Sequence, residues 1–211
     1  MIYELRTYTL KPGAQPTVAQ TSAELGRDIR GDNYGRLEGY WMTEIGALNQ
    51  VVHLWSYESF EERARLRGEL SQNGRWTGEY LPRLLPNLMR QEVRIMNAFV
   101  PAKAPATEGN IYELRCYRAK PTKVKPWAQA FANIMPVREK YSACSGAWIC
   151  ESGQPNEVCH LWAYPDLNTR VETRAKVMQD PQWQEFLAEA KDYLEEMQST
   201  IMLPASHSRM Q

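Results

Sequence analysis

The sequence lacks the short motifs that mark the most familiar catalytic sites. It contains no G-x-S-x-G, H-E-x-x-H, Walker A or G-x-G-x-x-G pattern. The sequence therefore gives no support for a serine hydrolase, a zincin, or a site that binds nucleotide phosphates or dinucleotides. Three histidines are present in the whole chain, too few for a conventional histidine-rich metal centre. We expect no bound metal.

Long apolar runs and an excess of one charge are also missing. No stretch approaches the roughly 20 apolar residues of a membrane-spanning helix, and the first residues do not resemble a secretory signal. Lys and Arg number 25, as do Asp and Glu, so the basic excess that attracts nucleic acid or anionic lipid is absent. The arginines at 63, 65 and 67 lie among Glu61, Glu62 and Glu69, which indicates a solvated helix face. We expect neither a nucleic-acid nor a membrane partner.

Cysteine is scarce and confined to the second half of the chain. The four residues are Cys116, Cys144, Cys150 and Cys159, and no two of them form a C-x-x-C pair. This spacing fits neither a disulfide scaffold nor a zinc knuckle. We interpret the four as reduced, mostly buried thiols of a cytoplasmic protein. A disulfide between Cys150 and Cys159 across a predicted hairpin is the less favoured alternative.

The chain does contain an internal repeat. The segment Ile-Tyr-Glu-Leu-Arg-Thr-Tyr at residues 2–8 returns as Ile-Tyr-Glu-Leu-Arg-Cys-Tyr at 111–117, and residues 39–57 align without gaps to 146–164 with ten identities. The same offset pairs Arg63 with Arg170, Arg67 with Arg174 and Trp76 with Trp183. A period near 107 residues is too long for a solenoid, so each copy should be a whole domain. We predict domains at 1–100 and 110–204, joined by a Pro- and Ala-rich linker at 100–110.

Each copy is predicted to have the element order β-α-β-β-α-β of a ferredoxin-like domain. In the first copy, strands are expected at 2–9, 37–44, 50–57 and 92–99, and helices at 16–30 and from Ser59 to about 70. A further helical piece is expected at 76–85. The second copy repeats this order, with a helix at 126–140 that Pro136 should end or kink, a helical piece at 182–193 and a closing strand at 197–203.

One face of each predicted sheet is polar and aromatic. Alternation places Glu4, Arg6 and Tyr8 on one face of the first strand, and His53 and Trp55 on one face of the third. In the strand order 4-1-3-2 these two strands are neighbours, so we expect the five side chains to lie together on the sheet face away from the helices. Aromatic side chains bury large areas, so this face should meet the same face of the duplicate. The predicted fold is α+β: two tandem ferredoxin-like domains whose antiparallel sheets pack face to face as a pseudo-two-fold α/β barrel. A barrel swapped between two chains is an alternative.

These residues resemble a known family. The repeated Ile-Tyr-Glu-Leu-Arg-x-Tyr strand is similar to the opening of the NIPSNAP domain, and the hairpin with Trp41 and His53-Leu-Trp55-x-Tyr57, repeated from Trp148 to Tyr164, is similar to its middle strands. The resemblance implies the dimeric α/β-barrel superfamily, which includes cofactor-free monooxygenases, isomerases and haem enzymes. It transfers the fold better than the chemistry.

The candidate site contains equivalent residues from both copies. We expect His53, His160, Glu4 and Glu113 to act in acid–base catalysis, because a carboxylate next to a histidine fixes its tautomer and raises its basicity. Substrate would be held by the arginines and stacked on the aromatic side chains; these residues are Arg6, Arg115, Tyr8, Tyr117, Trp55 and Trp162. The alternative is that glutamate and arginine simply pair with each other inside the fold. Trp41, Trp148, Trp76 and Trp183 are interpreted as packing residues.

The resulting functional hypothesis is an enzyme without a bound cofactor. It would bind a small aromatic or carbonyl compound in the barrel, as a monooxygenase or an isomerase. Haem held by His53 or His160 is a further option, by analogy with barrel relatives. The alternative from another class is a non-catalytic protein that binds a ligand or a protein partner. Self-association into a homo-oligomer is also expected, because zero net charge favours it.

Overall fold

The computed structural model describes all 211 residues, which divide into two compact units. The first unit comprises residues 1–95 and 203–211, and the second comprises residues 96–202. The elements of the first repeat are β1 (Ile2–Leu10), α1 (Gln15–Thr21), the π-helical turn η1 (Ser22–Gly26), α2 (Arg27–Arg30), β2 (Arg36–Ile45), β3 (Gln50–Tyr57), α3 (Phe60–Ser71), η2 (Trp76–Tyr80), α4 (Leu81–Leu84), η3 (Leu85–Asn87) and β4 (Leu88–Val100). Those of the second are β5 (Ile111–Ala119), α5 (Val124–Arg138), β6 (Cys144–Ser152), β7 (Glu157–Tyr164), α6 (Leu167–Val177), α7 (Pro181–Ala190), η4 (Lys191–Tyr193) and β8 (Leu194–Pro204).

The helix starts follow the local sequence. Ser59 is extended and its side chain accepts a hydrogen bond from the Glu62 amide, which caps α3 as predicted. In the second repeat Asp166 caps α6 and Asp180 caps α7 in the same manner. Pro136 lies inside α5, which ends two residues later at Arg138. Proline at that position removes one backbone donor from the last turn.

The strand order confirms the predicted α+β barrel class. The eight strands follow the order β1-β3-β2-β8-β5-β7-β6-β4 in a closed antiparallel barrel. Register is the same in the two repeats: Arg6 lies opposite His53, as Arg115 lies opposite His160, and Glu4 lies opposite Trp55, as Glu113 lies opposite Trp162. The five predicted side chains of each copy are therefore on one face of neighbouring strands.

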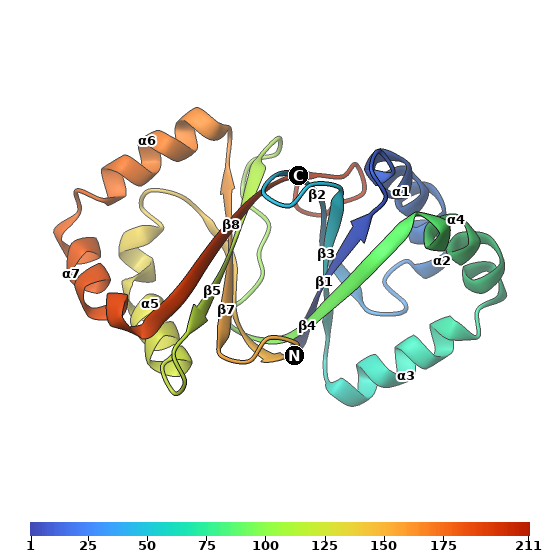
Figure 1. Cartoon of the computed structure of the whole chain (residues 1–211), viewed down its shortest axis with the longest axis horizontal. Helices are drawn as coiled ribbons and strands as arrows, with labels where there is room; N and C mark the ends of the chain where they lie inside the picture. Colours follow the sequence, from blue (N-terminus) through green and yellow to red (C-terminus); the bar gives the residue numbers. More distant parts are fainter. The chain divides into compact units, whose positions relative to one another are not determined.

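That face is turned toward the helices, which corrects the sequence-based prediction. Figure 1 shows helices α1 to α4 on one side of β1 and β3, and α5 to α7 on one side of β5 and β7. In the first unit Trp55 and Tyr57 pack with Leu66 of α3 and Leu84 of α4. The opposite face carries smaller apolar side chains such as Leu5 and Leu54, which are also buried. The prediction failed because it treated the helices as purely apolar partners, whereas they supply arginines to the polar face.

The Gly-x-Trp pattern that occurs in both repeats has a packing reason. Trp41 is buried and its ring lies over Gly39 on the same face of β2; a Cβ on Gly39 would stand 2.2 Å from the ring. Trp148 covers Gly146 in the same way, at 2.4 Å. The two tryptophans are packing residues, as expected.

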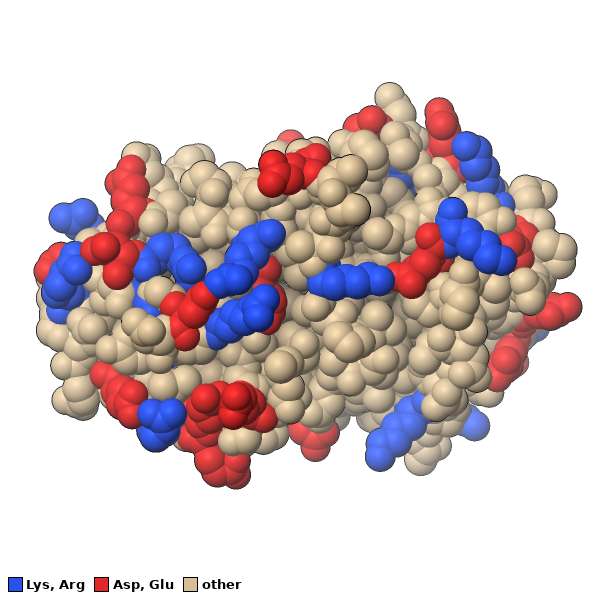
Figure 2. Space-filling view, turned by 180° about the vertical axis from the view of Figure 1, so that it is seen from behind, with Lys and Arg blue, Asp and Glu red and all other residues tan.

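Residues 101–110 contain no helix or strand, as expected for a linker. After β8, the C-terminal residues return to the first unit, where the Ala205 amide donates to the carbonyl of Tyr40 and the Ser208 hydroxyl accepts from the Tyr40 amide. None of the helices is both long and apolar enough to cross a membrane. On the face shown in Figure 2, basic and acidic side chains lie next to one another.

Candidate functional site

A buried carboxylate lies at the centre of an arginine cluster in the first unit. Glu4 has no exposed side-chain surface and forms ion pairs with Arg6 at 2.9 Å, with Arg67 at 3.5 Å and with Arg63. Arg63 and Arg67 project from α3, so the helix and the strand are joined through this group. The expectation that these arginines only face solvent is wrong: their side chains are 23% and 35% exposed and contact Glu4.

The second unit contains the same cluster with one addition. Glu113 pairs with Arg115 at 2.7 Å, Arg170 at 2.6 Å and Arg174 at 4.0 Å. The Ser199 hydroxyl of β8 also donates to it at 2.6 Å. The internal pairing of glutamate and arginine that the sequence left as an alternative is therefore present in both repeats.

The cluster keeps both carboxylates ionised. Burial raises the pKa of Glu113, but hydrogen bonds from Arg170 and Ser199 and the charges of Arg115 and Arg170 outweigh it and lower the pKa to about 2. For Glu4, burial is likewise opposed by Arg6, Arg67 and Arg63, and the pKa falls below its ordinary value. A carboxylate held in this way is a poor proton acceptor near neutral pH.

Each histidine is paired with the tryptophan two residues further along its strand. The Trp55 indole N–H donates to Nδ1 of His53 at 2.6 Å, and the Trp162 indole donates to Nδ1 of His160 at the same distance. Nδ1 is thus an acceptor, which places the ring proton on Nε2. Burial, with added repulsion from Arg6 or Arg115, lowers the pKa of both histidines well below 6.5. Each is therefore a neutral ring that carries its proton on Nε2.

His160 is only 3% exposed, and its buried Nε2 atom makes no hydrogen bond. A buried donor without a partner costs about 1–3 kcal/mol. The ring lies edge-on to Tyr117, 4.8 Å between centroids, and contacts Phe131 at 4.9 Å. Such a donor in an apolar setting indicates a place for an acceptor atom.

A second arginine covers each tryptophan. The Arg30 guanidinium lies 3.3 Å from the centre of the Trp55 ring and donates to the Tyr57 hydroxyl. Its equivalent Arg138 lies 4.2 Å from the Trp162 ring and donates to the Tyr164 hydroxyl. Sequence analysis did not single out these arginines, although their matching positions at the ends of equivalent helices were a usable signal.

A pocket lies between sheet and helices in each unit. The first has a volume of about 350 Å³ and the second about 370 Å³, within the range of small-molecule sites. The lining of both includes the strand arginine, the tyrosine, the histidine and the tryptophan: Arg6, Tyr8, His53 and Trp55 in one, and Arg115, Tyr117, His160 and Trp162 in the other. Trp76 and Trp183, interpreted from the sequence as packing residues, also line them.

The far walls of the two pockets differ. In the first, the Ser22 hydroxyl bonds to the hydroxyls of Tyr40 at 3.1 Å and Tyr80 at 2.9 Å. We call Ser22, Tyr40 and Tyr80 the hydroxyl cluster. In the second pocket the comparable wall is apolar and contains Trp127, Phe131, Phe186, Met178 and Met197.

The C-terminal residues contribute to the first pocket. His207 lines it, and its ring lies 4.5 Å from that of Tyr40. Burial, with repulsion from Arg27, lowers the pKa of His207 to about 4. The sequence offered no signal for this residue, because it lies outside the repeated segments.

Comparison with known proteins agrees with the repeat. The NIPSNAP family profile matches residues 3–102 and again residues 112–209. The chain belongs to the NIPSNAP family. It is 30% identical over 215 residues to human Protein NipSnap homolog 3B, covering 98% of this chain and 84% of that protein.

Two solved structures share the fold of this NIPSNAP chain at low sequence identity. A "putative monooxygenase" from Lactobacillus acidophilus superposes with a TM-score of 0.71 at 10% identity, over 97% of this chain and 94% of that chain. An "anthrone oxidase-like protein" superposes with a TM-score of 0.69 at 11% identity, over 99% and 92%. These likenesses confirm the barrel fold.

The histidines of this NIPSNAP chain do not fit an axial haem ligand. A histidine that binds iron through Nε2 carries its proton on Nδ1 and donates it to an acceptor. Here the indoles of Trp55 and Trp162 donate to Nδ1, so that position must accept. The arrangement favours a hydrogen-bonding histidine.

Proposed function

We propose that each unit binds a small compound with an aromatic body and an anionic or carbonyl oxygen in the pocket between its sheet and its helices. The ligand oxygen accepts from the histidine Nε2–H and from the strand arginine, and the aromatic body packs against the pocket walls. The pocket differs in place from the barrel interior considered at first. The residue types are those expected from the sequence.

The observation that supports this most directly is the unsatisfied donor of His160. Its Nε2 is buried, its Nδ1 is occupied by Trp162, and the residue lines the second pocket. Arg115, which lies opposite His160 in the sheet, uses Nε for Tyr117 and Nη1 for Glu113. A ligand oxygen would satisfy the histidine donor and lie near a positive charge.

The same geometry changes the role proposed for the histidines and glutamates. General-base action by His53 or His160 would need a ring nitrogen free to accept a proton, and Nδ1 already accepts from tryptophan. Glu4 and Glu113 are held ionised by arginines. We therefore propose oxyanion stabilisation for the histidines and arginines, and positioning of those arginines for the glutamates.

The binding proposal is tested with two probes that differ only in charge. We expect 2-naphthoate to bind the protein and its uncharged counterpart 2-naphthamide to bind about tenfold more weakly, since a hydrogen bond to a charged group contributes roughly 1.5–3 kcal/mol. Isothermal titration calorimetry measures both affinities. Equal affinities for the two probes would contradict charge-assisted recognition by the strand arginine, and binding of neither probe would contradict the proposal.

The histidine is tested in the second pocket. His160→Phe keeps an aromatic ring but removes the donor, and we expect about tenfold weaker naphthoate binding there, whereas His160→Gln keeps a donor and retains part of the affinity. The matched control is His53→Phe, which should leave binding in the second pocket unchanged. Loss of binding in both His160 variants with native circular dichroism would indicate a packing role only.

The reaction that best fits an oxyanion pocket is oxygen insertion into a substrate that forms a stabilised enolate. Two structures of the same fold have names that point to oxidation. An anthrone loses a methylene proton to give a phenolate-like anion without a strong base. Reaction with O₂ converts the methylene to a carbonyl, and the two hydrogens leave with the second oxygen atom as water. Isomerisation through a similar enolate is the second reaction of this class.

An oxygen electrode distinguishes catalysis from binding. With an anthrone as substrate, we expect oxygen uptake above the buffer rate and a fall of at least about tenfold when both histidines are replaced, in His53→Phe/His160→Phe. Uptake at the buffer rate with intact binding would assign the protein to the non-catalytic alternative. The cytoplasmic location and the homo-oligomer stay predictions, and sedimentation velocity measures the latter.

A further inference from the structure

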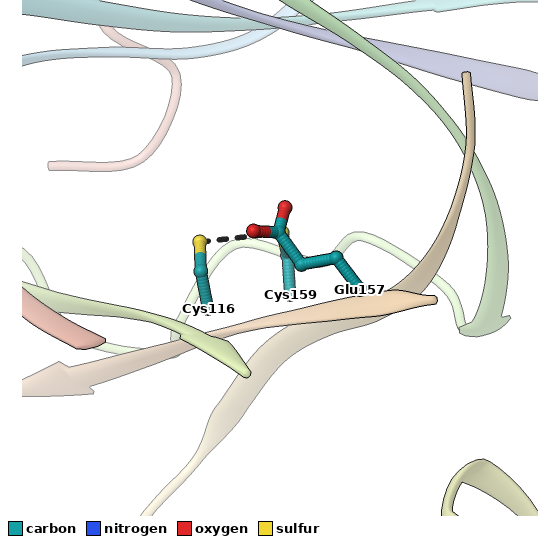
Figure 3. A group of neighbouring side chains, drawn as sticks. All are labelled: Cys116, Glu157 and Cys159. Carbon is teal, nitrogen blue, oxygen red and sulfur yellow. Dashed lines mark hydrogen bonds between the residues drawn. The ribbon is translucent and has the colours of Figure 1, made fainter. Parts of the chain in front are cut away.

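A second chemical cluster lies in the second unit, on the face of β5 and β7 opposite the arginine pocket. Cys116 and Cys159 are direct partners across the two strands, with 3.3 Å between their sulfur atoms. Glu157 precedes Cys159 by two residues, so its side chain is on the same face, and its Oε1 lies 3.5 Å from the Cys159 sulfur. Figure 3 shows the three side chains rising from the strands toward one point.

The three possible ligand atoms lie within 4.8 Å of one another. Zinc binds thiolate at about 2.3 Å and carboxylate oxygen at about 2.0–2.2 Å in tetrahedral geometry, which separates neighbouring ligand atoms by about 3.5–4 Å. The separations of 3.3 Å between the two sulfur atoms and 3.5 Å between the Cys159 sulfur and the Glu157 oxygen are close to this spacing. Small side-chain rotations would therefore suffice to place one ion among the three atoms.

The composition of the cluster favours a borderline-soft divalent ion. Two thiolates select zinc over magnesium or calcium, which prefer oxygen ligands. Cys159 is buried while Cys116 is partly exposed, which leaves a path for an ion and a fourth position for water.

The first unit provides an internal comparison. At the equivalent positions it has Thr7, Val52 and Gln50 in the same register. None of these offers a thiolate or a carboxylate, so all three ligands are absent together there. The cluster is thus present in the second repeat and absent from the first.

We propose that Cys116, Cys159 and Glu157 form a three-ligand zinc site with a water molecule as the fourth ligand. Binding displaces the two thiol protons to solvent, and no electron is transferred. The site is separate from the proposed organic-ligand pocket, because successive residues of β5 and β7 point to opposite faces of the sheet.

The first test uses the reduced, untagged full chain freed of metal by a chelator. We expect native mass spectrometry to show one zinc ion per chain after addition of zinc chloride. Cobalt(II) should give a thiolate-to-cobalt charge-transfer band in the near ultraviolet. A chain that binds neither ion overturns the proposal. If an air-exposed sample of that chain also has a denatured mass lower by two hydrogens, the two cysteines form a disulfide instead of a metal site.

Substitutions then locate the ion. Cys159→Ser and the more exposed Cys116→Ser should each remove the cobalt band and weaken zinc binding by about tenfold or more, and Glu157→Gln should keep a weaker band. Cys144→Ser is the matched control, because Cys144 is buried elsewhere on the sheet and donates to the carbonyl of Gly146. Equal cobalt bands in Cys159→Ser and Cys144→Ser, with both variants folded by circular dichroism, would refute the site.

Discussion

Glu113 illustrates how single residues hold the site together. It is fully buried, and four side chains from three elements of the second unit approach it: Arg115 of β5, Arg170 and Arg174 of α6, and Ser199 of β8. The ion pairs offset the cost of burying its charge, and their main effect is to fix where the arginines lie. In the proposed function, this corresponds to a positioning role that acts through Arg115 on the pocket.

The low pKa of Glu113 makes stability depend on pH. The folded carboxyl titrates at about 2, against 4.5 for the ordinary side chain. Between these values the unfolded chain binds a proton that the folded chain does not, so the contribution of Glu113 is complete above about pH 4.5 and is lost as the pH falls toward 2. The full contribution is roughly 3 kcal/mol.

Urea unfolding at a series of pH values between 2 and 6 measures this effect. We expect Glu113→Gln to unfold more easily than the native chain at pH 6, with the difference in unfolding free energy shrinking as the pH approaches 2. Glu69→Gln is the control, because the Arg65–Glu69 pair is largely exposed and contributes at most about 1 kcal/mol. A pH-independent difference for Glu113→Gln would contradict the assignment.

At the scale of elements, the repeat preserves the strands better than the helices. Both β2 and β6 keep a glycine under a tryptophan, and both β3 and β7 keep the His-x-Trp pair. The helix after the first strand differs: the first unit has a π-helical turn at η1, and the second has the single α5 helix. Ser22 of η1 is the centre of the hydroxyl cluster, whereas Phe131 of α5 fills the apolar wall. The two pockets therefore share the side formed by the strand arginine and histidine, and they differ on the helix side.

The glycine beneath the tryptophan predicts a large effect of one methyl group. Gly39→Ala would place Cβ 2.2 Å from the Trp41 ring, and overpacking of this kind costs typically 1–3 kcal/mol. Gly68→Ala is the matched control, for which we expect a change in stability of the opposite sign. Gly68 is an exposed residue within α3 with nothing near its Cβ position, and alanine there should stabilise the protein by about 0.5–1 kcal/mol.

Thermal unfolding followed by circular dichroism compares the two variants. We expect a lower midpoint for Gly39→Ala and a slightly higher one for Gly68→Ala. Equal midpoints would show that the Trp41 ring moves aside without cost.

At the scale of the whole molecule, the chain has two related pockets, one in each unit, and their walls contain different side chains. The C-terminal residues join only the first, where His207 lies against Tyr40. Fusion of two repeats in one chain allows each pocket to change by itself, whereas identical subunits of a homodimer would have to change together.

Removal of the C-terminal residues should separate the two pockets. A chain ending at Pro204 loses His207 and the Ser208 bond to Tyr40. We expect naphthoate affinity in the first pocket to fall by about tenfold, in keeping with one lost hydrogen bond and exposed apolar surface, while the second pocket is unchanged. Calorimetric titration in the His160→Phe background isolates the first pocket. The point variant His207→Ala tests the side chain alone, and an equal loss in both pockets would indicate general destabilisation.

The sequence by itself determined the duplication, the order of elements and the gathering of one set of side chains on neighbouring strands: Glu4, Arg6, Tyr8, His53 and Trp55 with their counterparts. These follow from local alternation and from the repeat, which need no knowledge of distant contacts. Only the tertiary structure decided that this face meets the helices. From the sequence, a helix with so many charged residues is expected to face solvent, whereas in the structure α3 supplies Arg63 and Arg67 to the buried carboxylate of Glu4. It also decided that Cys159 lies beside Cys116, since strand pairing across the sheet joins residues 43 positions apart. The tautomer of each histidine depended likewise on the side-chain donor that packing brought to Nδ1.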